Sequence, residues 1–137
     1  MRILLLVLLF SVSALAQTSS DLRQKYGEPI SETFKIRPQV LLTVSYAKTG
    51  EVCSMLIEPQ DTWVGYTKLN DTEPLKGKVL NEILEELAPK NQRGKFLMGT
   101  HRNGLLEYYE RIDVQRSGQI DKWNYAVIYW KIKACEN

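Results

Sequence analysis

Hydrophobic and polar residues alternate along residues 33–46, TFKIRPQVLLTVSY. The apolar side chains fall on even positions: Phe34, Ile36, Val40, Leu42, Val44 and Tyr46. A period of two places such residues on one face of a β-strand. Pro38 interrupts the pattern, and it lacks the amide hydrogen that strand pairing needs. The segment therefore predicts either an edge strand or two strand pieces that break at Pro38.

A hairpin is predicted directly after this segment. Residues 47–50 read AKTG, and Gly50 supplies the positive φ that a tight loop needs. Residues 51–59 then return as a second strand, in which Cys53 and Ile57 share a face.

Two segments show the period of an α-helix. Residues 75–87 are flanked by prolines and carry an apolar stripe at four-residue spacing, consisting of Leu75, Val79, Ile83 and Leu87. Residues 19–26 predict a shorter and more polar helix, which Ser19 or Ser20 would cap and Gly27 would end.

The last third of the chain reads as β-structure, with Asn103-Gly104 as a turn signal and alternation in residues 105–115 and 124–134. The predicted core positions are Leu106, Tyr108, Ile112 and Val114 in the first segment, and Ala126, Ile128, Trp130 and Ile132 in the second. The order of elements predicts an α+β fold, in which an antiparallel sheet of about four to six strands carries two helices on one face.

The N-terminal segment has the form of a signal peptide. Residues 1–16 read MRILLLVLLFSVSALA, with one positive charge, a short apolar run and a small-x-small ending. The alternative is a buried N-terminal helix. Because the apolar run is too short to span a bilayer, no membrane span is expected. The sequence thus predicts a signal peptide over 1–16 and a single domain over 17–137, secreted or periplasmic.

Cys53 and Cys135 are the two cysteines of the chain. An even number of cysteines in an oxidising compartment predicts a disulfide, which would hold down the C-terminal strand. Two free thiols, or a cysteine–histidine nucleophile, are the alternatives. Strand alternation places Cys135 among outward residues and Cys53 among inward ones, so a bulge or a strand end must turn one of them.

Charge and motifs restrict the classes of function. The chain has 18 basic and 16 acidic residues, a balance that disfavours binding to nucleic acid. The sequence contains none of the phosphate-binding, serine-hydrolase, zinc-protease or calcium-loop motifs, and a single histidine gives little support for zinc. We therefore expect no metal and no cofactor.

Two residues are weak candidates for catalysis. His101 is the only histidine and could act as a general base, although a solvent-exposed histidine beside a turn explains it as well. Glu110 falls on the predicted apolar side of its strand, where burial would favour an acid with a raised pKa. Its alternatives are a position on the strand rim, or a bulge at Tyr108 and Tyr109 that turns it outward.

Aromatic residues are concentrated near the C-terminus, and two of the tyrosines among them indicate a binding surface. Alternation places four side chains on the outer side of the last strand: Tyr125, Tyr129, Lys131 and Lys133. Tyrosines on a rigid sheet suit contact with an exported protein, a peptide or a glycan, and the lysines favour an acidic partner. Ordinary cross-strand pairing, or cover by a helix, would equally account for these tyrosines.

Four stretches of the chain read LRQKYGEPI, FKIRP, VSYAKTGEVCSMLIEP and YAVIYWKIKAC. Together they resemble small secreted bacterial proteins of an acidobacterial type that lack an assigned function. The leading helix, with its Gly-x-Pro stop, also resembles BamE-like domains, although the lipidated cysteine of those lipoproteins is missing here. The resemblance implies bacterial export and brings no catalytic residues with it.

Two functions follow as expectations. The first is a non-enzymatic, disulfide-stabilised binding module that acts outside the cytoplasm. The alternative is a small secreted hydrolase that uses His101 and a carboxylate. The sequence does not determine the partner or the oligomeric state.

Overall fold

The computed structural model describes residues 18–61, 63–64, 67–68, 73–102 and 104–136. The predicted signal peptide and Asn103 lie outside these residues. The elements are α1 (Ser19–Tyr26), β1 (Ser31–Arg37), β2 (Val40–Tyr46), β3 (Val52–Pro59), β4 (Trp63–Val64), β5 (Thr67–Lys68), α2 (Gly77–Leu87), α3 (Lys90–Arg93), β6 (Phe96–His101), β7 (Gly104–Tyr109), β8 (Ile112–Gln119), β9 (Lys122–Trp130) and the 3₁₀ turn η1 (Lys133–Cys135).

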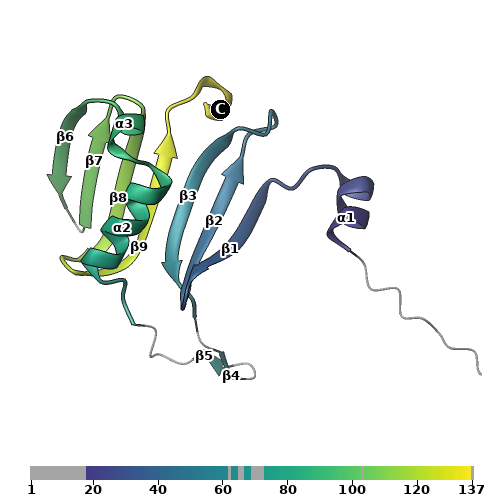
Figure 1. The fold of residues 1–137 in the computed structure, drawn as a ribbon, viewed down its shortest axis with the longest axis horizontal. Helices are drawn as coiled ribbons and strands as arrows, with labels where there is room; N and C mark the ends of the chain where they lie inside the picture. The colour runs from purple at the N-terminus through teal and green to yellow at the C-terminus, as the bar shows by residue number, and fades with distance from the viewer. Residues whose placement is uncertain (1–17, 62, 65–66, 69–72, 103, 137) are drawn as a thin grey trace, which may run out of the picture.

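The main sheet is antiparallel and contains seven strands in the order β1-β2-β3-β9-β8-β7-β6 (Figure 1). It consists of two meanders, β1–β3 and β6–β9, which meet where β3 pairs with β9. The short β4–β5 hairpin and the helices α2 and α3 lie between the meanders in the sequence. The α+β class is confirmed, whereas the predicted count of four to six strands is too low.

The segment around Pro38 forms two strands. β1 ends at Arg37 and β2 begins at Val40, and Gln39 between them has a φ of 60°. Because Pro38 cannot donate to the ladder, the chain reverses there and β1 becomes an edge strand. The next hairpin is closed by Gly50, whose φ is 86°, as the sequence predicts.

The chain also reverses at residues 110–111, where the sequence pattern predicts one continuous strand. The register pairs Glu107 of β7 with Val114 of β8, so the odd-numbered residues of β7 share the core side. Leu105 and Tyr109 accordingly pack against the core. The prediction that Leu106 and Tyr108 belong to the core is therefore wrong, because a two-residue turn changes the parity of the pattern.

Helix α2 covers the core face of the sheet. Its Leu80, Ile83 and Leu84 are at most 1% exposed, and Val79 and Leu87 pack at the edge of the same cluster. The sheet contributes Val40, Leu42, Val44, Ile57, Ile112, Val114, Trp123, Ala126 and Ile128. A helix with one broad apolar stripe buries that stripe on the apolar face of a sheet, and this packing makes the single core.

The N-terminal helix α1 does not pack on the sheet. Thr18, not Ser19 or Ser20, caps it in a reciprocal pair with Asp21, and Gly27 ends it with a φ of 88°. None of its residues is buried, and it lies beyond the β1 edge (Figure 1). The prediction of two helices on one face is therefore wrong for α1, whose short polar sequence offers no apolar stripe to bury.

The predicted disulfide between Cys53 and Cys135 is present, with a Cα–Cα distance of 5.5 Å. Strand β9 ends at Trp130. The turn η1 then brings Cys135 to Cys53, the second residue of β3. The strand end therefore resolves the conflict between the predicted faces of the two cysteines. Lys133 lies in this turn and not on the strand, contrary to the predicted position.

Within the described residues, no helix combines the length and the apolar character needed to cross a membrane.

Replacing Ile83 by alanine tests the packing of α2. The side chain is 1% exposed, so Ile83→Ala should lower the free energy of unfolding by about 2–4 kcal/mol. Urea denaturation measures the change, and Glu82→Ala on the exposed side of the same helix serves as the matched control. An Ile83→Ala midpoint as high as that of the control would show that α2 contributes little to the core.

Removing the disulfide tests its role at the junction of the meanders. The two cysteines are 82 residues apart, so the cross-link should stabilise the fold by up to about 4 kcal/mol through the entropy of the unfolded chain. The variant Cys53→Ser/Cys135→Ser should unfold at a lower urea concentration than the oxidised protein. It should match the wild type under reductant. Equal midpoints for oxidised and reduced protein would contradict this.

Candidate binding surface

One side of the sheet is open. Helix α2 packs on the core face, and no described helix lies on the opposite side, which we call the uncovered face. Strand register defines two rows of side chains that cross it. The first row is Thr33, Thr43, Leu56, Val127, Gln115, Leu106 and Thr100, and the second is Ser31, Ser45, Ser54, Tyr129, Asp113, Tyr108 and Met98.

The uncovered face is rich in hydroxyl groups, and its charged side chains are of both signs, with Lys35 and Glu58 in a further row and Asp113 paired with Lys131. Serine and threonine dominate its β1–β2 side, and Thr33 and Thr43 are joined by a hydrogen bond of 2.9 Å between their hydroxyl oxygens. Leu56 and Val127 are directly opposed at its centre, and Val127 is 9% exposed. The face thus has an apolar centre with polar groups around it, which is how protein recognition surfaces are commonly built.

The two predicted tyrosines belong to this face. Tyr129 is 44% exposed, and Tyr125, opposite Ser117 on β8, is half-buried. The α2 side of the same strand holds Ala126 and Ile128, both fully buried. No helix in the described part of the chain covers these tyrosines, so of the alternatives considered, helix cover does not apply.

Lys131 is on the same side but its charge is compensated. Its Nζ lies 2.7 Å from Asp113 Oδ1, donates a hydrogen bond of 2.7 Å to the Tyr109 carbonyl oxygen, and stands 5.8 Å from the centre of the Tyr108 ring. Asp113 Oδ1 is buried and receives no aligned hydrogen bond, so the contact with Lys131 is an ion pair held by charge alone. Lys131 therefore adds little net positive charge to this face, while Lys133 stays exposed in η1.

The two candidate catalytic residues lie apart from each other. His101 is exposed at one end of β6, whereas Glu110 follows the opposite end of the β6–β7 hairpin. At about 3.4 Å per strand residue, the length of β6 separates them by roughly 17 Å. Glu110 is also exposed, and its Oε2 accepts a hydrogen bond of 2.9 Å from the backbone nitrogen of Lys95. They cannot act together on one bond.

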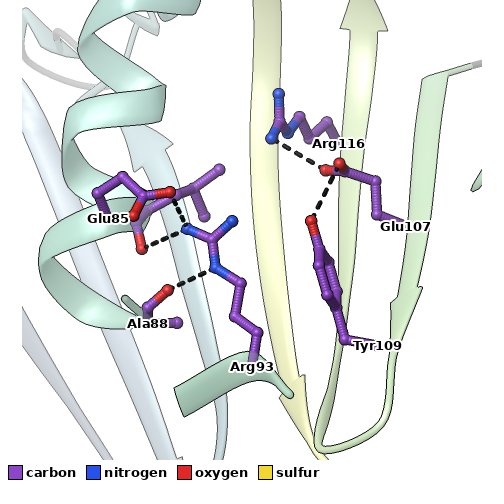
Figure 2. A network of polar contacts seen from close by, with 7 residues as sticks. Glu85, Ala88, Arg93, Glu107, Tyr109 and Arg116 are labelled. Carbon is purple, nitrogen blue, oxygen red and sulfur yellow. Dashed lines mark hydrogen bonds and ion pairs between the residues drawn. The ribbon is translucent and has the colours of Figure 1, made fainter. Parts of the chain in front are cut away.

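A buried arginine of α3 contacts the C-terminal end of helix α2 (Figure 2). Arg93 is 6% exposed, and it donates from Nε to the Ala88 carbonyl oxygen at 2.6 Å and from one terminal nitrogen to that of Leu84 at 3.2 Å. The same nitrogen contacts Glu85 Oε1 at 2.7 Å. The Leu84 carbonyl also accepts from the Ala88 backbone nitrogen, whereas the Ala88 carbonyl follows the last turn and lies beyond the intrahelical ladder. Arg93 therefore serves as a cap for α2.

A second polar cluster lies beside it on the core face (Figure 2). Arg116 contacts Glu107 Oε2 at 3.0 Å, and the Tyr109 hydroxyl donates to Glu107 Oε1 at 3.3 Å. Arg116 also lies over the Trp123 ring, at 5.9 Å from its centre. The pair of Glu107 and Arg116 was not predicted from the sequence, although Arg116 shares the parity of the apolar residues Ile112 and Val114, which is a signal for a partnered charge.

Helix α1 is fastened to the sheet by charged side chains. Arg23 forms ion pairs with Glu28, at 2.6 Å, and with Glu32 of β1. The Tyr46 hydroxyl donates to the other oxygen of Glu32 at 2.9 Å. These groups line an open hollow between α1 and the β2–β3 hairpin. Because Arg23 already contacts two carboxylates, the hollow offers little attraction for an anion.

The hydrogen bond to Glu32 affects the acidity of Tyr46. Donation to a carboxylate favours the protonated phenol, and burial and the negative charge of Glu32 act in the same direction, so the pKa of Tyr46 is raised above 10.0. The contact thus contributes stability fully below pH 10 and loses it as the pH rises through the folded-state pKa.

The described residues contain no group of three or more histidine, cysteine, aspartate or glutamate side chains that could hold an ion.

No family model matches the chain, and the searches of curated proteins and of solved structures also found no match. The candidate site therefore rests on the geometry alone.

An alkaline titration tests the Tyr46 contact. One tyrosine should ionise later than a free phenol, and Tyr46→Phe should remove this late phase from the tyrosinate absorbance. Glu32→Gln serves as the matched control, because it keeps Tyr46 but removes the carboxylate, and the late phase should move to lower pH. A late phase that persists in Tyr46→Phe would show that another tyrosine is responsible.

Proposed function

We propose that this chain is an exported, non-enzymatic interaction domain that binds its partner through the uncovered face. One observation carries the proposal: Tyr129 is 44% exposed at the centre of a sheet face on which no described helix packs. A sheet in a small domain ordinarily buries apolar side chains on its packed face and exposes polar ones on the other. Leu56 and Leu106, which are half-buried on the uncovered face, depart from that division.

The chemistry of the face indicates the class of partner. Tyrosine offers a large rigid surface and a hydroxyl group at low entropic cost, and the surrounding serines and threonines offer adaptable hydrogen bonds. The Lys131–Asp113 ion pair cancels the local charge, so steering by long-range attraction is weak. We therefore favour a partner with a largely neutral surface, which is another exported protein, a peptide or a glycan. The acidic partner that the lysines indicated is no longer favoured.

Export is part of the proposal. A disulfide between Cys53 and Cys135 is stable in an oxidising compartment, and residues 1–16 have the form of a signal peptide. Both observations support secretion or a periplasmic location. The alternative, a hydrolase that uses His101 and a carboxylate, receives no support from the positions of His101 and Glu110 at opposite ends of a hairpin.

Removing the two tyrosine rings tests the proposal. Tyr125→Ala/Tyr129→Ala should abolish capture of partners from the exported protein fraction and from a panel of neutral polysaccharides by the immobilised domain. The free energy of unfolding should change little, because Tyr129 is half exposed and the core lies on the other side. Tyr26→Ala on α1, which removes a ring that is 71% exposed elsewhere, is the matched control.

Two results would contradict the proposal. Unchanged capture by the double variant would mean that the face is not the binding surface. A domain that unfolds on this substitution would mean that the two rings are part of the structural core.

A further inference from the structure

We propose that the free edge of β6 binds an extended, acidic-ended peptide segment of a partner as an additional strand. The site is the open backbone edge of β6. Met98 also ends one row of the uncovered face, but the inference does not depend on the proposed function. Its basis is the position of β6 in the sheet, the side chains that it exposes and the charges at its ends.

Strand β6 has a partner on one side only. It ends the strand order and pairs with β7, with Met98 opposite Tyr108 and His101 opposite Leu105. An edge strand presents backbone N–H and C=O groups on its open side, and an incoming extended chain satisfies them. From Met98 to His101 the register with β7 is regular, so the free edge there has the straight geometry that pairing needs.

The side chains of β6 are unusually apolar for an exposed edge. Phe96, Leu97 and Met98 are consecutive, and their exposed fractions are 52%, 55% and 53%. A register shift between Phe96 and Met98 allows all three to face solvent, while the Phe96 ring packs edge-on against Tyr109 at 5.5 Å. Leu97 and Met98 lie outside the core cluster, and runs of exposed apolar residues such as this one mark interaction sites.

The opposite edge of the sheet is protected. Strand β1 carries Lys35 and Arg37 and ends at Arg37, directly before Pro38. Its start is held by the contact between Arg23 and Glu32. Charged residues and proline are the common means by which proteins prevent pairing at an edge. The contrast between the two edges indicates that β6 is left open for a partner.

The charges at the ends of β6 identify the occupant. Lys95 precedes the strand, and His101 and Arg102 are exposed at its end. If a second copy paired antiparallel through β6, its Lys95 would face Arg102, and like charges opposite each other destabilise a strand pair. Glu110 accepts from the Lys95 backbone and offsets part of the charge at that end, so the His101–Arg102 end is the more basic. A foreign segment with an apolar centre and acidic ends is the complementary partner.

Synthetic peptides provide the test. The probe is a fluorescently labelled peptide with an alternating centre, Val-Thr-Val-Thr-Val, and two glutamates at each end. The control peptide has the same centre and two lysines at each end. Anisotropy should show binding of the glutamate peptide, with the lysine peptide about tenfold weaker or more. N-methylation of alternate residues along one edge of the glutamate peptide should abolish binding, whereas methylation along the other edge should leave it intact.

Protein variants locate the site. Leu97→Ser/Met98→Ser should weaken binding of the glutamate peptide about tenfold or more, whereas Phe34→Ser on β1 should leave it unchanged. Hydrogen exchange should slow at β6 amides in the complex and not at β1. Tyr125→Ala/Tyr129→Ala should bind the peptide like the wild type, which separates this inference from the proposed function.

Each contrary result overturns the inference. These results are the absence of binding by the glutamate peptide, equal binding by the two peptides, and tolerance of both methylation patterns. Slower hydrogen exchange at β1 amides instead of β6 amides would show that the peptide binds the other edge of the sheet. Sedimentation that shows a dimer lost in Leu97→Ser/Met98→Ser would make a second copy the occupant.

Discussion

The pairing of β3 with β9 is the contact on which the rest of the sheet depends. It joins the two meanders through the residue pairs from Ser54–Tyr129 to Ile57–Ala126, and strands within each meander pair only with their neighbours in sequence. Helix α2 packs across the buried side of this junction, where Ile57, Ala126 and Ile128 meet. The disulfide lies at one end of the same junction, so covalent, hydrogen-bonded and apolar contacts all stabilise one long-range pairing.

The same junction sets the chemistry of the two faces. One helix with a well-developed apolar stripe is available, and it covers one side of a seven-stranded sheet. The other side has Leu56 and Val127 paired across the junction, on the same face as Tyr125 and Tyr129. Had α1 carried a comparable stripe, it would have had an apolar surface to cover. Its polar sequence leaves it tethered by Arg23 at the margin instead.

Local patterns predicted the elements well and their arrangement less well. The break at Pro38, the loop at Gly50, helix α2 and the disulfide all follow from the chemistry of single residues or short periods. The turn at residues 110–111 lacks glycine and proline, so no local signal marks a chain reversal there. Alternation was therefore continued across the turn, and it assigned Leu106 and Tyr108 to the wrong face. The compensation of Lys131 by Asp113 depends on strand register, which alternation within one strand does not contain. A register shift between Trp123 and Tyr125 interrupts the alternation of β9, so Trp123 is buried. Parity holds from Tyr125 to Tyr129, and it places both tyrosines on the side opposite Ala126 and Ile128.

The location of the disulfide has a topological consequence. Cys53 belongs to the first meander and Cys135 follows the second, so the bond encloses every residue of the connection between them. A single proteolytic cut in a connection between the strands of that loop leaves two fragments that are still covalently joined and keep β3 and β9 intact. In a compartment rich in proteases, one cleavage would convert the chain into a two-chain protein and would not release either half.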